Sequence, residues 1–215
     1  MRERYLFEMI VPGSEKETRR PAPVYAQDPP KQDGLKELAG EARQCSRCSL
    51  RSQAQQVVFG EGNPAADLMF VGEGPGAAED EQGLPFVGEA GQLLNKILAA
   101  AQIRREEVYI ANVVKCRPPE NRTPQKEEVE SCLPYLLRQI DCVRPRIIVC
   151  LGALATQALL GGEARVTKVR GRWHNREGIQ VMPTFHPAAL LRDPAKKKPV
   201  WEDIQKVRDA YRLLK

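Results

Sequence analysis

The sequence of 215 residues lacks any apolar run near the roughly 20 residues that a membrane-spanning helix needs. Its opening segment, residues 1–20, has neither a long apolar stretch nor a small-residue cleavage site, which argues against a secretory signal. We therefore expect a cytoplasmic protein that does not contact membranes. Because the cytosol is reducing, the six cysteines indicate a metal centre or catalysis rather than a disulfide framework.

The chain also lacks a strong excess of one charge and any internal repeat. Its 33 Lys and Arg against 28 Asp and Glu give a net charge of +5, which permits a polyanionic partner without requiring one. Residues 1–34 are rich in proline and charge and show no periodicity, so they are expected to form a flexible N-terminal arm. The remaining length, residues 35–215, suits one domain.

From Leu35 onward, apolar residues recur at the spacings of helices and strands. Helical spacing predicts helices over 35–42, 90–101, 153–160 and 200–214, and one that begins with Thr123 as N-cap and Pro124 as first residue. Short apolar runs predict strands over 67–74, 107–114, 146–152, 168–174 and 179–185. The Gly- and Pro-rich stretch 75–88 is expected to be a loop. Strands alternating with helices predict an α/β fold, with a parallel sheet between two helical layers.

Polar residues that folding does not require follow three of these strands. They lie in VGEGPG (71–76), NVVKCRPP (112–119) and TFHPAALLR (184–192). In open parallel sheets, ligands bind outside the carboxyl ends of the strands. We therefore expect the three segments to contribute to one ligand site.

Four cysteines have the spacing of metal ligands. They form the pairs Cys45-x2-Cys48 and Cys116-x15-Cys132. Two thiolates two residues apart can bind one metal centre from a single turn, and two more complete four-coordination. Zinc, an iron–sulfur cluster and unliganded thiols all remain open on spacing alone. The other two cysteines, Cys142 and Cys150, are expected to be buried in the core.

The segment Gly72–Ala77 formally fits the G-x-G-x-x-A pattern of dinucleotide-binding loops. The following helix is expected only about a dozen residues later, whereas the pattern requires it to begin within the motif. Pro75 also removes one backbone donor from any phosphate-binding loop. Nucleotide binding is therefore disfavoured.

Together, the segment GEGPGAAEDEQGLPFVGEAGQLL (72–94), NVVKCRPP and TFHPAALLR resemble the signature segments of the family-four uracil-DNA glycosylases. The resemblance covers residues 35–214. It implies a three-layer α/β/α fold with a central four-stranded parallel sheet, and hydrolysis of the N-glycosidic bond of deoxyuridine in DNA during base excision repair. It also implies a monomer that acts on uracil-containing DNA, single- or double-stranded. The cysteine spacing matches the family's 4Fe–4S cluster, which favours iron over zinc and assigns Cys45, Cys48, Cys116 and Cys132 as ligands.

The resemblance also implies roles for residues that would meet a flipped-out base. Phe86 matches the residue that stacks on uracil, and Glu79 the one that stands beside uracil C5 and excludes thymine. Asn112 matches the residue that reads uracil, because a side-chain amide offers both the donor and the acceptor that O4 and N3 require. His186 is the candidate donor to O2 of the uracil anion.

Cleavage also requires a water molecule to be oriented against an oxocarbenium-like sugar. Better-known relatives carry an Asp where this chain has Gly74, and family-four members usually have Ala there. Gly74 is a small departure and is equally unable to act as a base. Glu73 is the nearest carboxylate and the candidate for positioning water or stabilising the sugar cation.

Residues after the third segment are expected to contact DNA. Arg192 and the lysines at 196–198 would bind backbone phosphates, with an affinity that weakens as salt rises. Leu191 could wedge into the gap that the flipped base leaves. His174, the other histidine, is expected to be structural or a phosphate contact.

Two alternatives remain. The first is a module that binds or traps uracil-DNA without turnover, but trapping relatives use a His in an inserted basic loop, and residues 115–128 contain neither His nor insertion. The second is a zinc or iron–sulfur interaction protein whose site has decayed. The presence of Glu73, Phe86, Asn112 and His186 argues against it.

Overall fold

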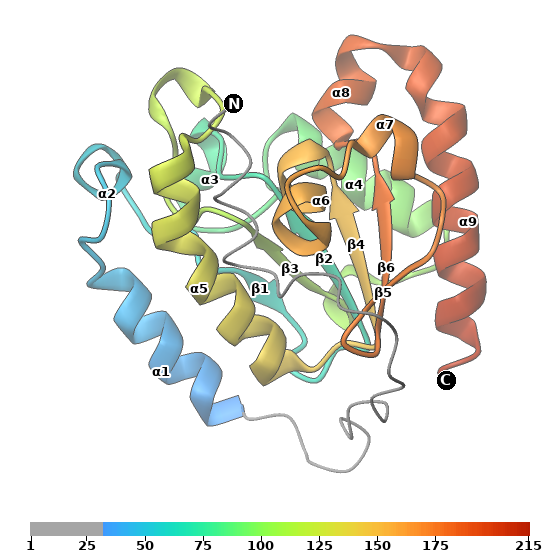
Figure 1. The fold of residues 1–215 in the computed structure, drawn as a ribbon, viewed down its shortest axis with the longest axis horizontal. Helices are drawn as coiled ribbons and strands as arrows, with labels where there is room; N and C mark the ends of the chain where they lie inside the picture. Colours follow the sequence, from blue (N-terminus) through green and yellow to red (C-terminus); the bar gives the residue numbers. More distant parts are fainter. Residues whose placement is uncertain (1–31) are drawn as a thin grey trace.

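The computed structural model describes residues 32–215 (Figure 1). The expected N-terminal arm falls outside the described residues, except that helix α1 begins at Gln32, within its last three positions. No helix in residues 32–215 is long and apolar enough to cross a membrane.

One six-stranded sheet forms the centre of the fold, in the order β1-β3-β2-β4-β6-β5. Its strands are β1 (Glu61–Gly62), β2 (Leu68–Gly72), β3 (Tyr109–Asn112), β4 (Ile147–Leu151), β5 (His174–Arg176) and β6 (Ile179–Thr184). The four central strands β3, β2, β4 and β6 are parallel, and the short edge strands β1 and β5 are antiparallel to their neighbours. The expected four-stranded parallel sheet is therefore confirmed, and two short edge strands extend it.

Helices cover both faces of the sheet (Figure 1). They are α1 (Gln32–Arg43), α2 (Leu50–Gln53), α3 (Ala77–Gln82), α4 (Glu89–Ala100), α5 (Lys126–Val143), α6 (Ala153–Leu160), α7 (Val166–Val169), α8 (Pro187–Arg192) and α9 (Lys197–Arg212). Short 3-10 helices lie in the connections of the described part of the chain, at Arg105–Glu107, Pro119–Asn121 and Pro194–Lys196.

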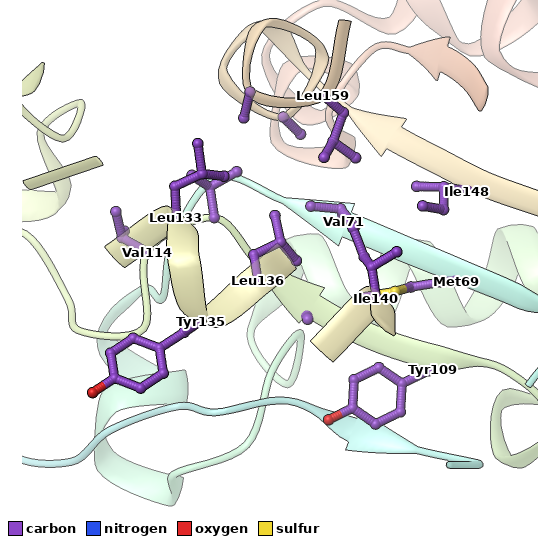
Figure 2. Packing of buried hydrophobic residues seen from close by; sticks show 14 of the residues in the cluster. Met69, Val71, Tyr109, Val114, Leu133, Tyr135, Leu136, Ile140, Ile148 and Leu159 are labelled. Atoms are coloured by element: carbon purple, nitrogen blue, oxygen red, sulfur yellow. The ribbon is translucent and has the colours of Figure 1, made fainter. Parts of the chain in front are cut away.

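The alternation of side chains along β2 explains the layers. Met69 and Val71 face one way and pack against α1, α5 and α6, as Figure 2 shows for part of this cluster. Leu68 and Phe70 face the other way and pack against α4, α8 and α9. Because every residue of β2 is buried, the strand needs apolar side chains on both faces, which is typical of the centre of a parallel sheet.

Three sequence expectations were wrong in detail. The stretch 75–88 is not all loop, because α3 forms within it. Glu79 accepts the N–H of Gly76 at the start of this helix, and Gly83 ends it in the left-handed conformation with φ of +72°. Helix α5 begins after Gln125 rather than Thr123, since the Gln125 N–H is capped by the carboxylate of Glu128.

The expected strand over 168–174 is also wrong. Its first residues belong to helix α7, and β5 begins only at His174. Between them, Gly171 has φ of +71°, and Arg170 is held by the carboxylate of Asp203 on α9. These contacts turn the chain before it can pair with β6 as a strand.

Candidate active site

A pocket of about 320 Å³ lies at the carboxyl ends of β2, β3 and β6. It is lined by Glu73, Gly74, Pro75, Gly76, Glu79, Phe86, Ala90, Asn112, Pro118, Asn121, Arg122, Pro124, His186, Ala188 and Arg192. The three segments expected to share a ligand site therefore meet in one cavity. Of the non-cysteine residues singled out from the sequence as principal site residues, only Leu191 is outside this lining.

Asn112 presents an unsatisfied acceptor to this pocket. It is the last residue of β3 and is only 1% exposed, and its Oδ1 has no hydrogen-bond partner in residues 32–215. Leaving such an atom buried and unpaired costs about 1–3 kcal/mol. A ligand that brings an N–H donor to Asn112 would remove this cost.

Gly72 allows the pocket to be this narrow. A Cβ at position 72 would lie 2.4 Å from Asn112 Oδ1 and 2.6 Å from Phe86 Cζ. The backbone of residue 72 does not require glycine, but the close approach of the two side chains does. Packing in this pocket therefore explains why Gly72, the first glycine of the G-x-G-x-x-A pattern, is a glycine.

Phe86 adopts a strained backbone conformation, with φ of +55°. A bulky residue rarely occupies this region, and such strain is typical of functional sites. Glu79 supports the loop: its Oε1 accepts the N–H groups of Val87 and Gly88 at 2.9 and 2.8 Å, and its Oε2 accepts that of Gly76. The Glu79 carboxylate thus fixes the wall that carries the Phe86 ring.

His186 is the N-cap of α8, and its ring lies across from Phe86, with centroids 5.6 Å apart. Its Nδ1 accepts the N–H of Ala188 at 3.2 Å, so the proton of the neutral ring must be on Nε2. Burial and the charge of Arg192 lower the pKa of His186 to about 4, and Glu79 opposes this shift. The ring is therefore a neutral donor at pH 7.

Glu73 and Arg192 also line the pocket. Burial raises the pKa of Glu73, and the positive charge of Arg192 opposes the shift. A Cβ at the neighbouring Gly74 would lie 2.7 Å from Val114 Cγ2, so glycine suits the packing here. The departure from the usual family alanine therefore fits its surroundings.

The segment 118–124 forms a wall of the pocket, and the sequence analysis expected only the part of it that lies within NVVKCRPP (112–119). Pro118, Asn121, Arg122 and Pro124 contribute to it. Arg122 donates twice to the buried carboxylate of Glu128, at 2.8 and 2.7 Å, which fixes this wall to α5. The available signal for residues 120–124 was their position directly after NVVKCRPP.

The four cysteines with ligand spacing lie at the core cluster that contains Met69 and Val71. Cys116 belongs to this cluster, and the other three pack against it. Residues 32–215 contain no group of three or more Cys, His, Asp or Glu side chains arranged closely enough to hold a metal ion. Burial raises the pKa of the Cys116 thiol to about 12, and Cys132, Cys48 and Cys45 add to this shift. Four thiols from two pairs have the ligand type and number that an iron–sulfur cluster takes.

The remaining two cysteines differ in burial. Cys150 is fully buried in β4, as expected for a core cysteine. Cys142 is only partly buried and packs against the core cluster on α5.

Two of the residues expected to contact DNA are at the pocket, because Arg192 lines it and Leu191 precedes Arg192 on α8. Leu191 is 45% exposed on α8, next to Arg192. Lys196 pairs with Asp193 at 3.2 Å, so it is less available to phosphates than the sequence suggested. His174 Nε2 is 3.2 Å from the carbonyl oxygen of Val169, which favours the structural interpretation.

Comparisons with known proteins show the family to which the chain belongs. The model of the uracil DNA glycosylase superfamily matches residues 59–205. The chain is 48% identical to the type-4 uracil-DNA glycosylase of Thermotoga maritima, over 81% of this chain and 93% of that protein. It is 45% identical to the type-4 enzyme of Sulfurisphaera tokodaii, over 82% and 84% of the two chains. A type-5 uracil-DNA glycosylase of Pyrobaculum aerophilum is more distant, at 34% identity over 60% and 64%. The expected resemblance is thus confirmed, and the chain belongs to the uracil-DNA glycosylase superfamily, within its type-4 family.

Proposed function

We propose that this protein is a uracil-DNA glycosylase that accepts a flipped-out uracil and hydrolyses its N-glycosidic bond, leaving an abasic site. The observation that carries the proposal is the buried Oδ1 of Asn112, which has no hydrogen-bond partner among residues 32–215 and lies in a pocket shared with Phe86 and His186. Membership of the type-4 family supports the same activity.

In this proposal, Asn112 reads the base. Its Oδ1 accepts the N3–H of uracil, and its amide nitrogen donates to O4. Cytosine offers no donor at N3, so it would leave the buried acceptor unpaired, which a site of this kind rejects by about 10⁴–10⁵. Phe86 stacks on the base, a contact worth roughly 1–3 kcal/mol.

His186 stabilises the leaving group. The Nε2–H donates to O2 as negative charge develops on uracil, and one such donor contributes about 2.7–4 kcal/mol in the transition state. A neutral donor suits this step because it does not protonate the base outright. Glu73 positions the attacking water or stabilises the sugar cation, and Glu79 holds the loop of Phe86 and stands near uracil C5.

We further infer that Cys45, Cys48, Cys116 and Cys132 hold a 4Fe–4S cluster. When bound, the cluster would supply a cross-link between the segment before α2, the segment after β3 and helix α5. The N–H of Lys115 donates to Cys132 Sγ at 3.2 Å, a contact that also occurs around cluster thiolates. The purified protein should be brown and absorb near ~400 nm, and Cys132→Ser should abolish this band.

The DNA would lie across the carboxyl edge of the sheet. Arg192 contacts a phosphate there, and Leu191 enters the space left by the base. As the family resemblance implies, we expect the protein to act as a monomer on uracil-containing DNA, single- or double-stranded.

An excision assay tests the function. The protein is incubated with single- and double-stranded oligonucleotides that contain one uracil, and alkali then cleaves any abasic site. Asn112→Ala should lower excision by at least about 100-fold, since a base-reading hydrogen-bond pair is lost. The same substitution at the exposed Asn175 on β5, outside the pocket lining, is the control.

Absence of strand breaks from both substrates with cluster-loaded protein would refute the glycosylase proposal. A protein–DNA band that survives a denaturing gel would instead favour the trapping module. Full activity of Asn112→Ala would remove Asn112 from the mechanism.

A further inference from the structure

Lys115 is buried to an unusual degree for a lysine. It is only 2% exposed, and no carboxylate in residues 32–215 forms an ion pair with it. Lysines are almost never fully buried unless they are paired. The partners of its ammonium are instead two carbonyl oxygens: the main-chain oxygen of Asn112 at 2.6 Å and Oε1 of Gln139 at 2.5 Å.

Gln139 is itself held in one orientation. It is fully buried on α5, and its Nε2 donates to the main-chain oxygen of Phe59 at 2.8 Å and to the Tyr109 hydroxyl at 3.2 Å. Because the nitrogen is used in this way, Oε1 must face Lys115. The hydrogen-bond network therefore runs from Tyr109, the first residue of β3, through Gln139 and Lys115. It ends at Asn112, the last residue of the same strand.

The main chain of Lys115 is fixed as well. Its N–H donates to Cys132 Sγ at 3.2 Å, and its carbonyl accepts the N–H of Val58 at 2.8 Å. Beyond Asn112 the chain remains tied to the end of β2, through the N–H of Val113 and the carbonyl of Gly72. Lys115 is thus a rigid point from which its ammonium reaches back to Asn112.

This arrangement matters because no partner within residues 32–215 holds the side-chain oxygen of Asn112. The direction of that amide therefore depends on how its main chain is held. The ammonium of Lys115 binds the carbonyl group of the same residue, and a hydrogen bond from a charged donor is about twice as strong as a neutral one.

We propose that Lys115 is a positioning residue for base recognition, which fixes the main chain of Asn112 so that its amide faces the uracil before the base arrives. The inference rests on the proposed function. It assigns to the buried network of Lys115 and Gln139 a role in uracil affinity, beyond its contribution to folding.

The test separates base recognition from general stability. Lys115→Met keeps the apolar stem and removes the donor, whereas Tyr109→Phe cuts the same network at its far end and leaves the bond to Asn112 intact. Cluster-loaded proteins are compared for binding to two duplexes. One contains an uncleavable fluorinated deoxyuridine, and the other contains a tetrahydrofuran abasic-site analogue that has no base to read.

Lys115→Met should weaken binding to the deoxyuridine duplex by about 30-fold and lower kcat/KM for excision by about 100-fold, the effect of misplacing a recognition group by about 1 Å. Its affinity for the abasic duplex should change less than about threefold, because phosphate contacts dominate that binding. Tyr109→Phe should retain the preference for the base. Lys115→Gln keeps a neutral donor and should fall between Lys115→Met and the wild type.

Equal losses on the two duplexes would overturn the proposal, since they indicate a merely structural lysine. Unchanged binding to the deoxyuridine duplex would overturn it as well. If Lys115→Met does not fold, Lys115→Gln decides by the same criterion. Failure of the wild type to excise uracil would instead refute the proposed function, so the two failures are distinguishable.

Discussion

The pocket depends on the absence of a side chain at residue 72, and Gly72→Ala tests this directly. The new Cβ would lie 2.4 Å from Asn112 Oδ1 and 2.6 Å from Phe86 Cζ, whereas ordinary contacts begin at 3.4 Å. Both side chains would therefore have to move by about 1 Å to restore normal packing. The substitution thus displaces the proposed reading and stacking groups together.

Two magnitudes follow from this displacement. Overpacking of this kind lowers the free energy of unfolding by about 1–3 kcal/mol. A misplacement of about 1 Å at a reacting site lowers the rate by about 100-fold. Gly72→Ala should therefore remain folded at 25 °C, but excise uracil about 100 times more slowly than the wild type.

Single-turnover excision kinetics and urea unfolding measure the two effects on the same preparations. Gly40→Ala is the matched control, because a Cβ at this position on α1 meets no atom within 4 Å. It should leave excision unchanged and stabilise the fold by about 0.5–1 kcal/mol, through the helix propensity of alanine. Wild-type excision kinetics in Gly72→Ala would refute the account of the pocket, because its walls could then not be in the positions described.

Two further predictions concern charge. Since the pKa of His186 is about 4 in the folded protein, against an ordinary 6.5, the unfolded ring binds a proton before the folded one does. The free energy of unfolding should therefore fall as pH drops from 6.5 to 4, by up to about 1.4 kcal/mol per pH unit. His186→Asn should flatten this dependence in urea unfolding, and a ring resonance that titrates near 6.5 by NMR would contradict the prediction. Arg192→Ala should reduce the slope of log affinity for DNA against log salt by about 1, through loss of one phosphate contact. The control is Arg146→Ala, because Arg146 lies just before β4 and forms an ion pair with Asp67. This substitution should leave the slope unchanged. Equal slopes for the wild type and Arg192→Ala would exclude Arg192 from the DNA interface.

The layers of the fold and the convergence of the site were predictable from the sequence. Strands such as Ile147–Leu151 are continuous apolar runs, and helix Ala153–Leu160 begins and ends where its periodicity does. Parallel strands bring their carboxyl ends to one edge, so Asn112 and His186 could be expected in one pocket before any coordinates were known.

The parts that were missed depend on contacts rather than on local pattern. Helix α3 was hidden by its Gly- and Pro-rich surroundings, and its start depends on the contact between Glu79 and Gly76. The part of the pocket wall beyond NVVKCRPP, residues 120–124, has no periodicity and is held by the pair of Arg122 and Glu128. Lys115 was not singled out because a lysine is normally expected at the surface.

One contact of His186 has a consequence for altering the enzyme. The tautomer of the ring is dictated by a peptide N–H, that of Ala188, and among single substitutions only proline at position 188 deletes that group. Residues such as Ala90 and Pro118 shape the cavity without taking part in this contact. A redesign that enlarges the cavity for other damaged bases can therefore vary these positions. The imidazole then still carries its proton on Nε2, the nitrogen that donates to the departing base.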